Sequence, residues 1–238
     1  MLKVCIRVDD VGWGSESIEP WPHKKLDVGL RLAQQFHAAM QGLPYLGAVI
    51  PKALDKEGLA WLHSQPCGFT GAVHGYCHDA PNRVCDEFLR LEFAEIRRRV
   101  SYARDYCCLP YRHFVSPFNT YTDTLTDALV AEGFRYLWMG PVDRRYLPMR
   151  CFDDYNGPLP TLIPAWLPLY GCSCARMQST ERPLLDVWPG IKDEEGRAVL
   201  TLHLPWELAK NPSFDGLKNL VDMIHDHVMS PEEYIGDL

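Results

Sequence analysis

Apolar and polar residues along the chain predict short buried strands that alternate with amphipathic helices. The strands are short apolar runs that end in turn residues or in polar groups. They are predicted at residues 4–8, 45–51, 68–73, 114–117, 134–139 and 161–164, and from residue 198 to His203. Strands that alternate with helices are typical of parallel βα units. The pattern therefore predicts one α/β domain spanning residues 1–238.

The predicted helices begin at residues that commonly cap helix N-termini. Asp55 is expected to cap a short helix through His63, and Thr122 or Asp123 a helix that ends at Gly133. Further helices are expected at residues 27–41, at 86–106, and after Ser213 up to residue 228. The 86–106 helix contains three consecutive arginines at 97–99, which we interpret as a solvated face rather than a phosphate site.

Chemically active side chains follow several of these strands. Asp9 and Asp10 end the first strand, His74 and His78 follow the third, and His203 ends the last. The carboxyl ends of parallel strands meet at one face of a barrel, so one site is predicted there. Two histidines four residues apart can reach one divalent ion at about 2.0–2.1 Å. The alternatives are a solvated turn for the histidines and a turn for the aspartates.

In this order the motifs resemble those of the NodB-type polysaccharide deacetylases, carbohydrate esterase family 4. The matching stretches are Asp9-Asp10-Val11-Gly12, the His-Gly-Tyr-Cys-His run at 74–78, Ser116-Pro117-Phe118, and Leu202-His203. The resemblance implies a distorted or incomplete (β/α) barrel with one divalent metal ion, expected to be zinc. It implies the metal ligands Asp10, His74 and His78, the general base Asp9, the general acid His203, and an oxyanion-binding backbone N–H at Phe118.

Two positions depart from the usual family pattern. Gly75 stands where most chitin deacetylases have a serine or threonine, which places the chain nearer a divergent branch. Val115 stands where the family commonly has an arginine that tethers the base. Arg7 lies two residues before Asp9 on the same strand face, so we predict that it tethers Asp9 instead.

Segments that follow the site-bearing strands are expected to shape the substrate pocket. Trp13 and Trp206 are predicted to contact substrate, although loop packing explains Trp13 equally well. Pro117 fixes the turn that aims the next backbone amide. Residues 140–196 have little periodicity, and we expect them to cover the barrel mouth.

Composition excludes several classes of protein. The 238 residues are 47% apolar and carry a net charge of −7, so bulk charge attracts neither nucleic acid nor anionic membrane. No apolar run approaches about 18 residues, so no membrane span is expected. Nothing at the N-terminus has a signal-peptide layout, which predicts a cytoplasmic protein. The nine cysteines are expected to be mainly reduced; for Cys172 and Cys174, a metal site or a disulfide is the alternative.

These observations predict a metal-dependent hydrolase that removes an N-acetyl group from an amino sugar or saccharide precursor. The expected substrate is small, or linked to a nucleotide or lipid, as in surface-polysaccharide (for example lipopolysaccharide) synthesis. One alternative is a deformylase of an N-formyl sugar. Another is a saccharide-binding protein that has lost catalysis. A non-haem iron oxygenase is a third, since two histidines and one carboxylate also bind iron. The oligomeric state stays open.

Overall fold

The computed structural model describes residues 3–11, 30–64, 67–77, 87–109, 113–117, 122–139, 161–164, 197–203 and 215–236. Within these residues, parallel strands form one seven-stranded sheet in the order β6-β5-β4-β3-β2-β1-β7. The strands are β1 (Lys3–Val11), β2 (Tyr45–Val49), β3 (Phe69–Val73), β4 (His113–Val115), β5 (Tyr136–Met139), β6 (Thr161–Pro164) and β7 (Arg197–His203).

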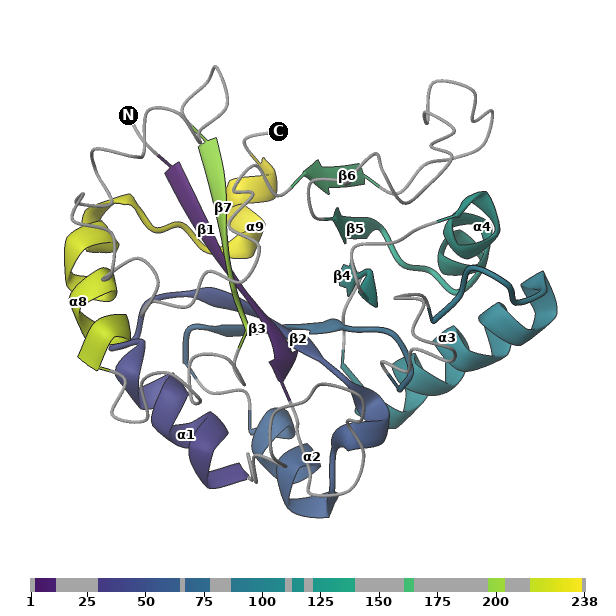
Figure 1. The fold of residues 1–238 in the computed structure, drawn as a ribbon, viewed down its shortest axis with the longest axis horizontal. Helices are drawn as coiled ribbons and strands as arrows, with labels where there is room; N and C mark the ends of the chain where they lie inside the picture. Colours follow the sequence, from purple (N-terminus) through teal and green to yellow (C-terminus); the bar gives the residue numbers. More distant parts are fainter. Residues whose placement is uncertain are drawn as a thin grey trace.

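The sheet curls, and helices lie around its outside (Figure 1). They are α1 (Leu30–Ala39), α2 (Lys56–His63), α3 (Phe93–Cys107), α4 (Asp123–Ala131) and α8 (Asp215–Ile224). In the described part of the chain, no pairing joins β6 to β7, so the barrel is open between them. The predicted incomplete (β/α) barrel is therefore confirmed. None of the described helices is long and apolar enough to cross a membrane.

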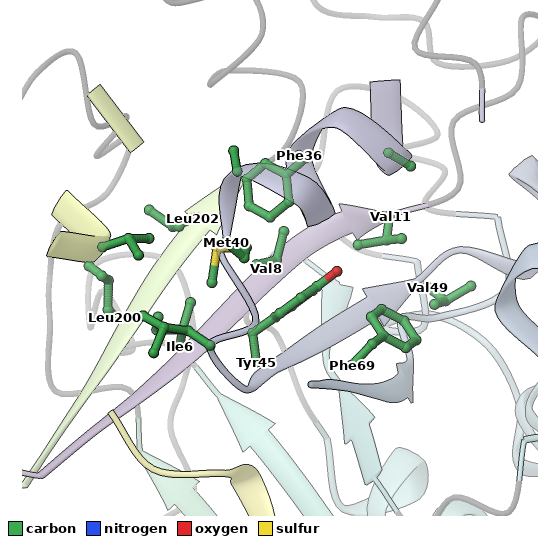
Figure 2. Close-up of a cluster of buried hydrophobic side chains, with 14 of the residues drawn as sticks. Ile6, Val8, Val11, Phe36, Met40, Tyr45, Val49, Phe69, Leu200 and Leu202 are labelled. Carbon is green, nitrogen blue, oxygen red and sulfur yellow. The ribbon is translucent and has the colours of Figure 1, made fainter. Parts of the chain in front are cut away.

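An apolar layer fills the space between the outer face of the sheet and helices α1 and α8. It contains alternate residues of β1 and β7 together with aromatic and aliphatic side chains from α1, β2 and β3 (Figure 2). Its buried members include Ile6, Val8, Val11, Phe36, Met40, Tyr45, Phe69, Leu200 and Leu202. Because this layer holds one face of β1 on the outside, the side chains on the other face of β1 point into the barrel.

The amino-terminal end of the barrel is closed by the short helix α9 (Pro231–Gly236). Tyr234 of α9 stacks on Trp138, with ring centroids 6.4 Å apart. Both belong to a second buried cluster, the inner apolar cluster, whose other members are Cys5, Leu46, Ala48, Ala72, Val115 and Val199. Just before α9, Val228 pairs with Val4 at the start of β1. The single final helix predicted up to residue 228 is therefore wrong: α8 ends at Ile224 and a 3₁₀ turn (His225–His227) follows.

Two predicted helix caps are confirmed, and one predicted start is wrong. Asp55 accepts a hydrogen bond from the Gly58 amide at 2.6 Å, and Thr122 accepts one from the Leu125 amide at 3.1 Å. Helix α3 begins at Phe93 rather than at residue 86, because Glu92 at its N-cap is extended. Residues 87–92 form bends and turns, and these leave Glu87 available to the site described next.

Candidate active site

A β-bulge in β1 places both aspartates on the inner side of the barrel. Val8 pairs with Gly47 and Val11 with Val49, so three steps along β1 match two along β2. Asp10 adopts the left-handed conformation, with φ of 62°. One strand residue is therefore inserted, and the side-chain alternation shifts by one position after it.

This shift explains how two neighbouring aspartates can serve one site, as the sequence predicted. Regular alternation would put Asp9 and Asp10 on opposite faces, and the strand was expected to end there. Instead β1 continues to Val11, which returns to the outer apolar layer with Val8 (Figure 2). Both carboxylates raise the pKa of the same imidazole, that of His74, so they share one site.

Arg7 and Asp9 form a buried ion pair inside the barrel. Arg7 Nε donates to Asp9 Oδ1 at 2.9 Å, and Arg7 Nη2 donates to Asp9 Oδ2 at 2.6 Å. The two residues are 1% and 2% exposed, so the pair is almost entirely removed from water. Such a bidentate contact fixes the plane of the carboxylate. The contact predicted between Arg7 and Asp9 is present, while Val115 is a buried apolar residue.

His74 lies directly after β3 and is held at both its backbone and its ring. Its amide donates to the Val49 carbonyl at 2.7 Å, and its Nδ1 lies 3.0 Å from the Val115 carbonyl. A carbonyl oxygen can only accept, so Nδ1 carries a hydrogen and Nε2 faces Asp10 Oδ1 at 3.4 Å. Burial disfavours the charged ring, but Asp10, Asp9 and the Val115 carbonyl together raise the pKa of His74.

The donor atoms of Asp10 and His74 fit a divalent metal. In neutral His74, Nε2 presents a lone pair toward a carboxylate oxygen, an arrangement that a divalent cation bound by both atoms would satisfy. Two donors bound to a tetrahedral zinc at about 2.0–2.1 Å lie about 3.3–3.4 Å apart, which matches the observed 3.4 Å. The described residues contain no cluster of three such ligands. The predicted third ligand, His78, lies outside them.

The loop after His74 depends on Gly75 and on a carboxylate that the sequence did not single out. Gly75 has φ of 69°, and a Cβ there would collide with the Glu87 carboxylate and the Pro117 ring. Glu87 is 4% exposed, and its Oε1 accepts hydrogen bonds from the Tyr76 and Cys77 amides at 2.8 and 3.1 Å. Only glycine fits at residue 75, because any side chain there would collide with Glu87 and Pro117. The contact of Glu87 with this loop is visible only in the folded structure.

The remaining predicted site residues are placed to different extents. Pro117 is buried beside the position of Gly75, which brings the loops after β3 and β4 together. The backbone of His203 is in register with Asp9 in the β1–β7 pair. Trp13, Phe118 and Trp206 lie outside the described residues, as do His78, most of residues 140–196, and both Cys172 and Cys174.

No model of a known protein family matches the chain, and no curated protein matches its sequence. Solved structures do match its fold. PuuE allantoinase superposes with a TM-score of 0.66 at 13% identity, covering 98% of this chain and 88% of that one. A family 4 carbohydrate esterase from Streptomyces lividans, in complex with acetate, gives 0.54 at 13% identity, covering 96% and 91%.

A third match is a carbohydrate esterase family 4 pseudoenzyme from Bacillus anthracis. It has a TM-score of 0.54 and 11% identity, and covers 98% of this chain and 64% of that one. The resemblance to carbohydrate esterase family 4 drawn from the motifs is therefore confirmed in the fold. This fold is shared by active enzymes and by a pseudoenzyme, so the function has to be argued from the site.

Proposed function

We propose that this protein is a metal-dependent hydrolase that removes an N-acyl group, in the first place acetyl, from an amino sugar or saccharide precursor. The observation that carries the proposal is the pairing at one end of the sheet. Arg7 holds the Asp9 carboxylate, and Asp10 faces the Nε2 atom of His74 at 3.4 Å. Two adjacent carboxylates thus have separate partners, as a base and a metal ligand require.

Each residue has a role in amide hydrolysis. Asp10, His74 and His78 would hold one divalent ion, expected to be zinc, which lowers the pKa of a bound water and polarises the substrate carbonyl. Asp9, oriented by Arg7, accepts the proton of the attacking water. His203, whose backbone is in register with Asp9, donates a proton to the departing nitrogen. The amide after Pro117, that of Phe118, donates to the developing oxyanion.

The proposed substrate depends on a cytoplasmic location, which is itself part of this proposal. A cytoplasmic enzyme meets soluble, nucleotide-linked or lipid-linked saccharides rather than finished cell-wall polymer, which favours a step in surface-polysaccharide synthesis. Trp13 and Trp206 would line the sugar-binding side of the site. An N-formyl sugar is the alternative substrate, because only the pocket for the acyl group differs.

Acyl release from a panel of N-acyl sugars, with and without a chelator, tests this proposal. Acetate or formate should be released, and the chelator should abolish release. Allantoin belongs in the panel because of the structural match to an allantoinase. Hydrolysis of allantoin alone would replace the saccharide substrate with a cyclic amide. Metal binding and sugar binding without turnover would indicate a protein that has lost catalysis, like the pseudoenzyme.

The two neighbouring aspartates provide a matched pair of variants. We expect Asp9→Asn to retain one metal ion per chain while kcat falls by about 10²–10⁴, because a positioned base is lost. Asp10→Asn should instead lose metal, since the ligand charge is removed, and asparagine tolerates the left-handed conformation of residue 10. Elemental analysis and steady-state kinetics measure both. The reverse assignment, with metal lost only in Asp9→Asn, would contradict the roles proposed here.

His203 is tested by the pH profile of kcat/KM. With an acid at this position the profile is bell-shaped, and His203→Ala should remove its alkaline limb. The loss should be greatest for amides with poor leaving groups, because an activated ester needs little help from an acid. An unchanged alkaline limb would assign the proton donor to another residue.

A further inference from the structure

Glu87 contacts the backbone that follows His74. It lies 13 residues after His74 in the chain, yet its carboxylate reaches back to residues 76 and 77. Its Oε1 accepts hydrogen bonds from two consecutive amides, Tyr76 N at 2.8 Å and Cys77 N at 3.1 Å. Consecutive amides that converge on one anion form a nest, and bonds to a charged acceptor are stronger than neutral ones.

The same short stretch is held from its other side. The Tyr76 carbonyl accepts a hydrogen bond from the Lys52 amide at 3.2 Å, which ties it to the 3₁₀ turn η1 (Pro51–Ala53) after β2. His74 is fixed by Val49 and Val115. The backbone from His74 to Cys77 is therefore held at each end, and the residue that follows Cys77 is the predicted ligand His78.

We propose that Glu87 is a positioning residue that holds the backbone of residues 74–77 in its metal-binding conformation and so sets the affinity for the metal. The inference rests on the proposed function, because it takes His74 and His78 as the ligands. Glu87 contacts backbone amides rather than the reacting atoms, so its effect is exerted through the backbone that follows the predicted ligand His74. Groups that hydrogen-bond directly to metal ligands typically change metal affinity by about 10–100-fold when removed, and we take this range as the expected size of the effect.

Gly75 supplies an independent way to disturb the same contact. A Cβ at residue 75 would meet the Glu87 carboxylate and the Pro117 ring. Gly42 is a matched control, because its φ of 81° also favours glycine but no heavy atom lies within 4 Å of its Cβ position. In both variants an alanine has to adopt a left-handed backbone conformation. Only the alanine at residue 75 also displaces Glu87.

The experiment measures metal affinity directly. Metal-stripped protein is titrated with Zn²⁺ against a chromophoric chelator, and with Co²⁺ while its visible absorption is recorded. We expect Glu87→Gln and Gly75→Ala to lower the affinity about 10–100-fold and to alter the Co²⁺ spectrum. Glu132→Gln is the control for loss of a buried carboxylate, since the Glu132 side chain is 7% exposed and binds Arg97 and Arg104 between α3 and α4. Glu132→Gln and Gly42→Ala should bind metal like the wild type.

Three results would overturn the inference. Wild-type affinity and spectrum in folded Glu87→Gln would make Glu87 a purely structural residue. Failure of both Glu87→Gln and Gly75→Ala to fold, with both controls folded, would show that the contact serves the fold as a whole. A wild-type protein that binds no metal would overturn the proposed function as well. A fourth result separates the two proposals. If the wild type binds metal and Glu87→Gln weakens that binding, but no acyl group is released, the inference about Glu87 stands and only the proposed reaction is wrong.

Discussion

At the scale of single residues, the Arg7–Asp9 pair is the costliest feature of the candidate site. Each side chain is at most 3% exposed, and removing an ion from water costs several kcal/mol unless its partner compensates. The two hydrogen bonds supply that compensation and fix the orientation of Asp9. A hydrophobic pair would serve stability equally well. The ion pair is therefore better explained by the fixed orientation it gives Asp9, which the proposed base requires, than by stability.

Arg7→Met should lower the free energy of unfolding by about 3–5 kcal/mol, because Asp9 keeps a buried charge without this partner. The double variant Arg7→Met/Asp9→Asn should recover part of that loss, since the uncompensated charge is gone. Urea denaturation at pH 7 measures both variants. Arg98→Met is the control and should leave the midpoint unchanged, because the Arg98–Glu95 pair lies at the surface. A double variant less stable than Arg7→Met would count against this account.

At the scale of elements, β4, β5 and α9 form a second polar arrangement around His113, next to the inner apolar cluster. Trp138 Nε1 donates to His113 Nδ1 at 3.1 Å, so this nitrogen must keep its lone pair. Burial lowers the pKa of His113 to about 4. His113 Nε2 lies 4.0 Å from Glu232 of α9, but protonation at Nδ1 would break the Trp138 hydrogen bond. We therefore expect neutral His113 at physiological pH.

This arrangement predicts a specific loss of stability in acid. The pKa of a histidine in the unfolded chain is about 6.5. Below that pH the unfolded state binds a proton at residue 113, whereas folded His113 stays neutral until the pH approaches its lowered pKa. Stability should fall as the pH drops from about 6.5 to about 4, by roughly 3 kcal/mol for this residue. His113→Gln, which retains an acceptor for Trp138, should flatten this dependence in urea denaturation.

The exposed His225 provides the control for the acid prediction. Its side chain is 65% exposed, so His225→Gln should keep the wild-type dependence of stability on pH. An equally steep decline in His113→Gln and the wild type would show that other groups cause the loss in acid.

At the scale of the whole molecule, the two ends of the barrel have separate tasks. Asp9, Asp10 and His74 lie at or after the carboxyl ends of β1 and β3, while α9 packs at the strand starts (Figure 1). Trp138 and the rest of the inner apolar cluster lie on the inner face of the sheet, and β7 brings His203 into register with Asp9. The site and the α9 closure should therefore respond independently to mutation.

Tyr234→Ala should lower the free energy of unfolding by about 3–5 kcal/mol, because a buried aromatic ring that stacks on Trp138 is removed. Metal affinity should remain at the wild-type value, since the change lies at the opposite end of the barrel. Phe93→Ala, at a ring that is 40% exposed, is the control and should change stability far less. Metal affinity that falls together with stability in Tyr234→Ala would show that the two ends are coupled.

The sequence by itself determined the features that depend on neighbouring residues. Apolar runs predicted the strands, and the side chains of Asp55 and Thr122 predicted two helix starts, because caps act within one turn. The motifs indicated the fold and nominated Asp10 and His74, which the structure brings within 3.4 Å. Even the Arg7–Asp9 contact followed from strand alternation, since β1 pairs without a break with β7 from Lys3 to Asp9.

Only the tertiary structure decided the features that depend on pairing between distant segments. The bulge at Asp10 arises from the register of β1 against β2, and a single sequence does not encode which residue a partner strand skips. Glu87 returns to Tyr76 and Cys77 across ten or more residues, with no periodic signal. The packing of α9 against Trp138 likewise joins segments far apart in the chain. Local patterns specify elements, whereas register and long-range contacts arise only when the elements pack together.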